Sequence, residues 1–311
     1  MHKILISHPV VGSYSFFLFF GILCGYLLSR FRANQFGLNG SHIDNVGLLG
    51  AIAGLFGARL FSWLFYMPPG IGFLRAFTEP GGGMVFYGGV VVGLAAVIAY
   101  SVIRHVSLPK LLDILAPGLI LGLAIGRIGC FMAGCCWGDL CEDRSAIAKV
   151  TGASALWQIQ TIPGISKASF PLAVRFPPDS GAYEQHVRLG LIDEHAARSL
   201  AVHPVQLYEA VLGLLLCVLL AKISPVRRRP GEIIGLMFVG YAIIRFTTEF
   251  VRADNAPKYF GLTLSQVISL CLAFGSAMFL LWSRFYRKRP EVTVVDAPKE
   301  ILPAFSLQNT K

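Results

Sequence analysis

Long apolar runs constrain this chain more than any other feature of its sequence. A transmembrane helix needs about 20 predominantly apolar residues, and a tilted one needs up to about 25. Runs of roughly this length lie at residues 13–30, 46–67, 84–104, 111–134, 204–223, 231–251 and 263–284. The sequence therefore predicts an all-α polytopic membrane protein with about seven transmembrane helices.

The composition excludes a soluble domain. Of the 311 residues, 14% are charged and 55% are hydrophobic, whereas a soluble domain carries about 25% charged residues. The net charge of +10 would suit a nucleic-acid binder, but the basic residues stand in short clusters between the apolar runs. Because they form no basic stripe with interleaved aromatic residues, we expect the lipid bilayer as a partner and no nucleic acid.

The placement of lysine and arginine predicts the orientation, since these residues gather in short cytoplasmic loops. They are frequent after the first, third, fifth and seventh runs and sparser after the second and sixth. The basic residues after the odd-numbered runs are Arg30, Arg32, Arg104, Lys110, Lys222, Arg227, Arg228, Arg229, Arg284, Arg287, Lys288 and Arg289. We expect the N-terminus outside and the C-terminus in the cytoplasm.

The predicted organisation has four parts. Residues 1–137 hold the first four spans, and residues 203–289 hold the last three. Between them, residues 138–202 form a polar extracytoplasmic arm, either a folded cap or a flexible insertion, with a short helix expected near 182–200. Residues 290–311 are predicted to be a disordered cytoplasmic tail. No strong internal repeat indicates a transporter built from inverted halves.

Charged side chains inside the sixth run are the first candidates for a site. A charge at the middle of a membrane costs about 2.5–3.5 kcal/mol on insertion scales and usually marks function. Arg245, Glu249 and Arg252 follow one another at spacings of four and three residues, so they share a helix face. This stripe is net positive and suits an anion such as phosphate. The alternative is an interhelical ion pair that fixes packing.

Two further arginines lie in apolar runs. Arg127 stands near the end of the fourth run among glycines, which permit close helix packing or close approach of a ligand. Arg59 lies in the second run, where we expect a structural ion pair with Glu209 or Glu249.

Two polar motifs open the third and fifth runs. Tyr87 lies in GGGMVFYGG and could be an interfacial anchor, a hydrogen-bond donor or a base. In HPVQLYE, Gln206 and Glu209 share a face, and His203 could move a proton or serve only as a cap. The ends of these runs are all expected at the outer leaflet, which predicts a headgroup site for an anionic lipid.

These motifs together resemble the prolipoprotein diacylglyceryl transferase family, the bacterial enzymes of lipoprotein maturation. The resemblance covers roughly residues 13–137 and 203–284. It is carried, in this order, by GARLFSWLFY, GGGMVFYGGVVVG, LAPGLILGLAIGRIGCFMAGCCWG, HPVQLYE, GYAIIRFTTEFVR and LTLSQVISL.

The resemblance implies a seven-span enzyme of the bacterial inner membrane without a cofactor or metal. Such an enzyme moves diacylglyceryl from phosphatidylglycerol to the lipobox cysteine of a preprolipoprotein and releases glycerol phosphate. Arg127 and Arg245 match the arginines that would hold the phosphate. The candidate catalytic residues are Arg127, Arg245, Tyr87 and His203. The candidate lipid-binding residues are Arg127, Arg245, Glu249, Arg252, Gly138, Gln206, Tyr208, Glu209 and Arg59.

Departures from the family pattern predict a divergent member. Tyr87 replaces a histidine, Phe16 replaces a tyrosine, and Cys130 and Cys135 replace an asparagine and a glutamate. Three alternatives stay open: a paralogue with another lipid or acceptor, a transporter of anionic lipid without chemistry, and a thiol-redox enzyme.

The cysteines form the largest departure. Cys130, Cys135, Cys136 and Cys141 cluster without CxxC spacing, so a zinc ribbon is not expected. Because the expected compartment is oxidising, we favour a disulfide that fixes the arm to the fourth run. Simple packing and a redox or covalent thiol role are the alternatives.

Overall fold

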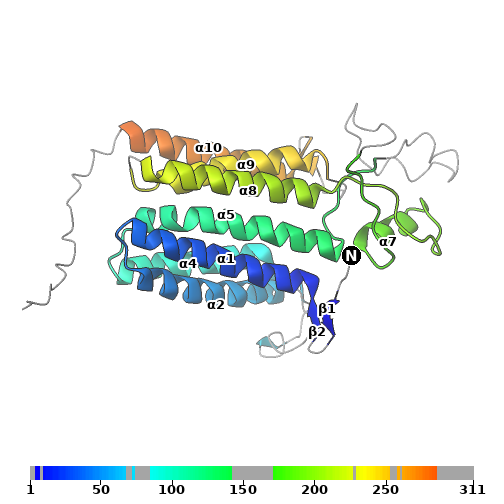
Figure 1. Cartoon of the computed structure of the whole chain (residues 1–311), viewed down its shortest axis with the longest axis horizontal. Helices are drawn as coiled ribbons and strands as arrows, with labels where there is room; N and C mark the ends of the chain where they lie inside the picture. The colour runs from blue at the N-terminus through cyan, green and yellow to red at the C-terminus, as the bar shows by residue number, and fades with distance from the viewer. Residues whose placement is uncertain are drawn as a thin grey trace, which may run out of the picture.

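Helices dominate the computed structural model, which describes residues 4–7, 10–67, 72–73, 85–141, 171–226, 229–252, 258–259 and 261–285. Within these residues, seven long helices coincide with the seven apolar runs and lie side by side as a bundle (Figure 1). They are α1 (Ser13–Gln35), α2 (Gly40–Phe65), α4 (Phe86–Ile103), α5 (Leu108–Ala133), α8 (Val205–Ile223), α9 (Glu232–Glu249) and α10 (Leu264–Phe285).

Five of these helices are long and apolar enough to cross a membrane. They are α1, α2, α5, α10, and α8 extended by the 3-10 turn η2 (Ser224–Val226). Helix α4 is apolar but shorter, and α9 includes Glu232, Arg245 and Glu249. The chain is therefore a polytopic helical membrane protein, and the count of seven spans stays a prediction.

The outward faces of the bundle are apolar. Phe19, Leu48, Leu215 and Phe274, from four different helices, are 62–71% exposed. Exposed apolar surface on this scale would be costly in water and is expected where lipid is the solvent.

Glycines let pairs of helices approach closely, as the sequence predicted for the fourth run. A Cβ on Gly25 of α1 would lie 2.5 Å from the carbonyl oxygen of Gly118 on α5. A Cβ on Gly129 would lie 2.9 Å from the Cβ of Phe17, whereas one on Gly126 would meet nothing within 4 Å. Gly129 therefore supports close packing, and Gly126 does not.

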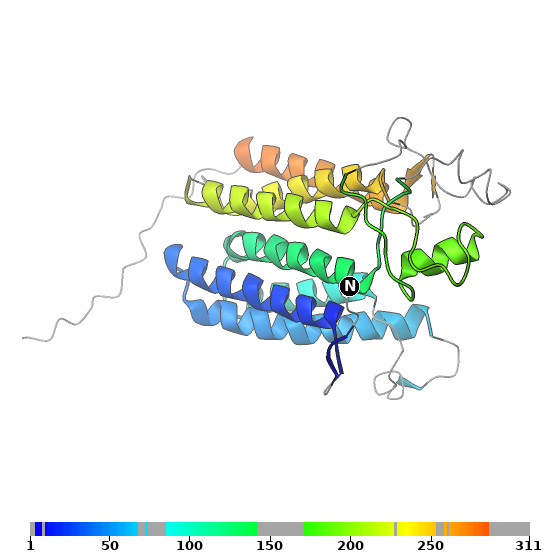
Figure 2. The same cartoon turned by 45° about the vertical axis from the view of Figure 1, so that its right-hand side comes forward.

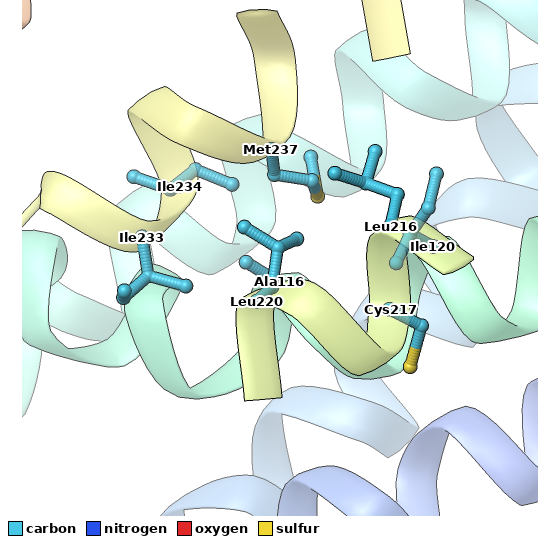
Figure 3. Close-up of a cluster of buried hydrophobic side chains, with 8 residues drawn as sticks. All are labelled: Ala116, Ile120, Leu216, Cys217, Leu220, Ile233, Ile234 and Met237. Carbon is cyan, nitrogen blue, oxygen red and sulfur yellow. The ribbon is translucent and has the colours of Figure 1, made fainter. Parts of the chain in front are cut away.

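Helices α5, α8 and α9 share one apolar core (Figure 3). It is formed by Ala116, Ile120, Leu216, Cys217, Leu220, Ile233, Ile234 and Met237. At one end of this core the buried Asp113 of α5 accepts hydrogen bonds from the backbone N–H groups of Gly231, Ile233 and Ile234, at 2.8, 3.0 and 3.0 Å. A carboxylate is favourable at a helix N-terminus, so Asp113 fixes α9 to α5.

The described part of the arm is folded and has its own small core of Leu140, Phe176, Ala182, Leu191 and Val202. It contains one short helix, α7 (Gly181–Arg188), which is shorter than the helix expected near 182–200. Isolated bridges join Leu140 to Val202 and Val174 to Val202. In Figure 2, α7 lies beyond the same end of the bundle at which α5 ends.

Two short hairpins complete the described structure. Strand β1 (Ile4–Ser7) pairs antiparallel with β2 (Val10–Gly12), with Ile6 opposite Val11. Strand β3 (Lys258–Tyr259) pairs with β4 (Leu262–Thr263) immediately before α10. The tail expected at 290–311 lies outside the described residues.

Candidate functional site

Glu209, near the start of α8, is the centre of the site. It is 6% exposed and lies between two arginines from different helices. Its Oε2 is 2.6 Å from Nε of Arg127, and its Oε1 is 3.2 Å from a terminal guanidinium nitrogen of Arg245. The hydroxyl of Thr248 donates to the same Oε1 at 2.9 Å. One buried carboxylate therefore orients both arginines.

Glu249, at the end of α9, forms the second half of the network. Its Oε2 is 2.9 Å from Arg245 and 3.7 Å from Nε of Arg252. The hydroxyl of Thr263 donates to its other oxygen at 2.8 Å, and Arg245 also donates to the hydroxyl of Ser265 at 3.0 Å. Arg245 thus contacts α8, its own helix α9 and α10, so its guanidinium is held from three sides.

The ion pairs described above join three arginines to two glutamates. Arg127 and Arg245 are still 24% and 17% exposed, so both retain donors that an anion could reach. Beside them a small pocket opens between α5, α8 and α9. It is lined by Ile120, Leu123, Ala124, Arg127, Glu209, Gly213, Tyr241, Ile244 and Arg245. Guanidinium groups next to an apolar wall suit an anionic headgroup attached to a lipid chain.

The start of the arm is joined to the network through its backbone. The N–H of Gly138 donates to the carbonyl of His203 at 2.9 Å, and the N–H of Asp139 donates to that of Val251 at 2.7 Å. A Cβ on Gly138 would lie 2.5 Å from Cγ2 of Val205 and 2.7 Å from the carbonyl oxygen of His203. Glycine is therefore required for this close approach.

His203 and Gln206 complete this corner of the site. The Nδ1 of His203 lies 3.3 Å from the hydroxyl of Tyr208, and burial lowers the pKa of His203. The imidazole is therefore neutral near pH 7 and able to accept a proton. Gln206 is fully buried, and its amide nitrogen donates to the carbonyl of Cys135 at 2.6 Å.

Three cysteines come together where α5 ends. The sulfurs of Cys130, Cys135 and Cys136 lie within 4.8 Å of one another. Hydrogen bonds with the thiols of Cys130 and Cys135 lower the pKa of Cys136, with a smaller contribution from the nearby arginines, while the thiol partners and burial raise the pKa of Cys135.

The structure joins none of the seven cysteines, all of which lie within the described residues, in a disulfide, so the disulfide favoured from the sequence is not present there. The physical reason is positional. Cys141 lies buried in the arm and outside the group of three sulfurs, and the remaining three are neighbours within one helix end.

Tyr87 and Arg59 lie in another part of the bundle. Tyr87 is at the start of α4 and is 56% exposed, and Arg59 is on α2. Helices α2 and α4 pack on each other and lie across α5 from α8 and α9 in both views (Figures 1 and 2). The ion pairs described for Glu209 and Glu249 are with Arg127, Arg245 and Arg252. The expected pairing of Arg59 with either glutamate stays a prediction.

Sequence reasoning missed the hydroxyl groups that support the network: Thr248 and Thr263 donate to the glutamates, and Ser265 accepts from Arg245. A signal for one of them was present. Thr263 precedes α10 and forms a capping box with Gln266: the N–H of Thr263 donates to the Gln266 side chain at 2.9 Å, and the N–H of Gln266 donates to the Thr263 hydroxyl at 3.3 Å.

The apolar helices form the bundle of a polytopic membrane protein. Arginines and glutamates from three of these helices form a buried network within it. Sequence comparison identifies the family. The chain matches the family model described as "Prolipoprotein diacylglyceryl transferase" over residues 3–282. It therefore belongs to this transferase family.

Individual relatives agree with the family match. The phosphatidylglycerol--prolipoprotein diacylglyceryl transferase of Clostridium tetani is 26% identical over 260 residues, covering 84% of this chain and 88% of the relative. The protein of the same name from Pectobacterium carotovorum is 28% identical over 280 residues, covering 87% and 88%. That from Paraburkholderia phymatum is 32% identical over 251 residues, covering 78% and 75%.

Proposed function

We propose that this chain transfers diacylglyceryl from phosphatidylglycerol to the thiol of the lipobox cysteine of preprolipoproteins. The single observation that supports this most is the placement of Arg127 and Arg245 on one buried carboxylate, Glu209, beside an apolar pocket. Both arginines stand in the motifs that resemble the transferase family, to which the chain belongs.

The chemistry follows from the charges. The phosphate of phosphatidylglycerol binds Arg127 and Arg245, with Arg252 adding positive charge behind Glu249. The acceptor thiolate attacks the glyceryl carbon that carries the phosphate ester, the carbon–oxygen bond breaks, and glycerol phosphate leaves with the bonding electrons. Guanidinium groups aimed at the phosphate stabilise the charge that develops there.

The thiol proton needs an acceptor, and His203 is our candidate. Its imidazole is neutral because burial lowers its pKa, and its Nδ1 contacts the hydroxyl of Tyr208. Tyr87 and Arg59 stay candidates for contacts with substrate outside the arginine network.

The membrane topology belongs to the same proposal. Seven spans place the N-terminus outside, the C-terminus in the cytoplasm and the arm on the outer face of the bacterial inner membrane. In this orientation the site lies at the outer leaflet, where a preprolipoprotein signal peptide presents its lipobox cysteine.

The test uses purified protein, phosphatidylglycerol micelles and a lipobox peptide, with mass spectrometry of the peptide. Wild type is expected to add a diacylglyceryl mass to the peptide cysteine, and Arg245→Ala is expected to abolish the addition. The matched control is Arg30→Ala, because Arg30 pairs with Asp44 at a partly exposed position. Normal turnover by Arg245→Ala would contradict the mechanism. Movement of lipid between leaflets without a peptide adduct would indicate a transporter.

A further inference from the structure

The backbone at the end of α5 gathers three thiols that the proposed transfer reaction does not use. The helix ends at Gly134, whose φ of 70° is left-handed. The chain then folds back, so that the N–H of Cys135 donates to the carbonyl of Cys130 at 3.1 Å. Cys136 also adopts a left-handed φ, of 60°, which costs about 1–2 kcal/mol for a residue with a Cβ. This conformation places three sulfurs from positions i, i+5 and i+6 in one group.

A second helix holds this turn in place. The amide nitrogen of the fully buried Gln206, on α8, donates to the carbonyl oxygen of Cys135 at 2.6 Å. The thiol group is therefore fixed by its own helix and by α8, so its geometry does not depend on the local backbone alone.

The spacing of the sulfurs fits a metal ion. Three sulfurs at about 2.3 Å from a central ion in trigonal geometry are roughly 4 Å apart, and the sulfurs of Cys130, Cys135 and Cys136 already lie within 4.8 Å of one another. Among the described residues, no histidine, aspartate or glutamate joins this group as a fourth ligand. Structural zinc is almost always four-coordinate, whereas thiolates also select the soft ion copper(I).

Nearby charges favour such a complex. Copper(I) with three thiolates carries two negative charges. Arg127 and Arg252 both interact electrostatically with Cys136, and Arg127 lies one helical turn before Cys130. These guanidinium groups also pair with Glu209 and Glu249, so they attract the anionic complex and offset part of its charge.

We propose that Cys130, Cys135 and Cys136 form a three-thiolate binding site for a soft monovalent metal ion, and that this ion is copper(I). Binding replaces the thiol protons by the ion, so the protons are released to solvent and no electron is transferred. The site adds to the proposed transferase function and does not rest on it.

The test is an anaerobic titration of the detergent-solubilised full chain with copper(I), in competition with the chelator bicinchoninate. Wild type is expected to bind one copper(I) per chain and to show an ultraviolet thiolate-to-copper band. The triple variant Cys130→Ser/Cys135→Ser/Cys136→Ser is expected to lose at least 100-fold in affinity and to lose the band. The matched control Cys24→Ser/Cys271→Ser changes two cysteines outside the group and is expected to bind like wild type.

A second readout covers the case in which the triple variant does not fold. Copper(I) is expected to raise the thermal midpoint of wild type and of the control but not that of the single variant Cys135→Ser. The proposal is overturned if wild type fails to compete with the chelator, or if the cluster variants bind as tightly as the control. Because binding is measured without lipid or peptide, neither result bears on the transferase assay.

Discussion

Replacing Asp113 with alanine is expected to destabilise the protein strongly, although Asp113 lies outside the proposed site. Its carboxylate is fully buried and accepts three N–H bonds at the start of α9. Each buried donor left without a partner costs about 1–3 kcal/mol, and a carboxylate is also favoured at the positive end of a helix. We expect the free energy of unfolding to fall by about 3–5 kcal/mol. This is the low end of the total for three unpaired donors, because water can reach part of the emptied space.

The assay is thermal unfolding of the purified protein in detergent. A loss of this size corresponds to a drop of roughly 10 °C in the midpoint for a chain of this length. Asp113→Asn keeps one acceptor oxygen and is expected to give an intermediate value. The control is Asp44→Ala. Asp44 pairs with Arg30 where both side chains are 39% exposed and accepts from the hydroxyl of Tyr26 at 2.8 Å, so we expect a smaller loss of about 1–2 kcal/mol.

Unfolding of Asp113→Ala within the range of the Asp44→Ala control would contradict this role of Asp113. In that case the three hydrogen bonds would contribute nothing net, and α9 would be held by its apolar contacts alone. A strong effect would show that one carboxylate positions the helix that carries Arg245 and Glu249.

Three further predictions concern the site and the arm. Glu209→Gln removes the charge that orients Arg127 and Arg245. Because a displacement of about 1 Å can cost about 100-fold in rate, we expect peptide modification to slow by about that factor, and we expect the control Glu194→Gln, at an exposed position, to leave the rate unchanged. Equal rates of the two variants would contradict the role of Glu209. Gly138→Ala places a methyl group 2.7 Å from the carbonyl oxygen of His203 and is expected to lower activity more than tenfold. In the control Gly126→Ala the methyl group meets nothing within 4 Å, so we expect unchanged activity. Similar activity of the two variants would argue against close packing at Gly138. Burial lowers the pKa of His186 in the arm to about 4, so between about pH 6.5 and 4 the unfolded arm binds more protons than the folded arm. The stability of the arm therefore falls as pH falls through this window, by up to about 3 kcal/mol. Hydrogen-exchange protection factors of arm amides, which correct for the slower intrinsic exchange in acid, are expected to fall at pH 4.5 in wild type and in His195→Asn but to change less in His186→Asn; an equal response of the two variants would contradict this.

The sequence located the long helices well because lipid requires continuous apolar runs. Their ends were harder to place. Helix α1 was expected to end at residue 30 and continues to Gln35, and α2 was expected from residue 46 and begins at Gly40. These extensions are polar, so hydropathy alone does not detect them. The side chain of Asn39 accepts from the N–H of Ser41 at the start of α2, which is a local capping signal.

The site was predictable where its contacts are local. Arg245 and Glu249 are four residues apart on one helix, so the sequence places them on one face, and their charged groups lie 2.9 Å apart. The contact of Arg127 with Glu209 joins two helices, and one sequence alone does not show which buried charges meet. Arg59 was named as a partner of Glu209 or Glu249, and that pairing stays a prediction, whereas the contacts of Arg127 and Arg245 with Glu209 appear only once the helices are packed.

The thiol group shows a second limit of sequence reasoning. Spacing argued against a zinc ribbon, and the expected compartment favoured a disulfide. The grouping of Cys130, Cys135 and Cys136 depends on left-handed backbone at Gly134 and at Cys136. A glycine hints at the first of these, but nothing in the sequence marks the second.

Diacylglyceryl transfer is tested directly by following both products of one reaction. Wild-type protein is incubated with a lipobox peptide and phosphatidylglycerol that carries an isotope label in its headgroup glycerol, and the peptide adduct and released glycerol phosphate are quantified together. We expect a diacylglyceryl thioether on the peptide cysteine and labelled glycerol phosphate in equal amounts, and neither product with Arg245→Ala. Release of a fatty acyl group instead, or consumption of lipid without a peptide adduct, would contradict this transfer.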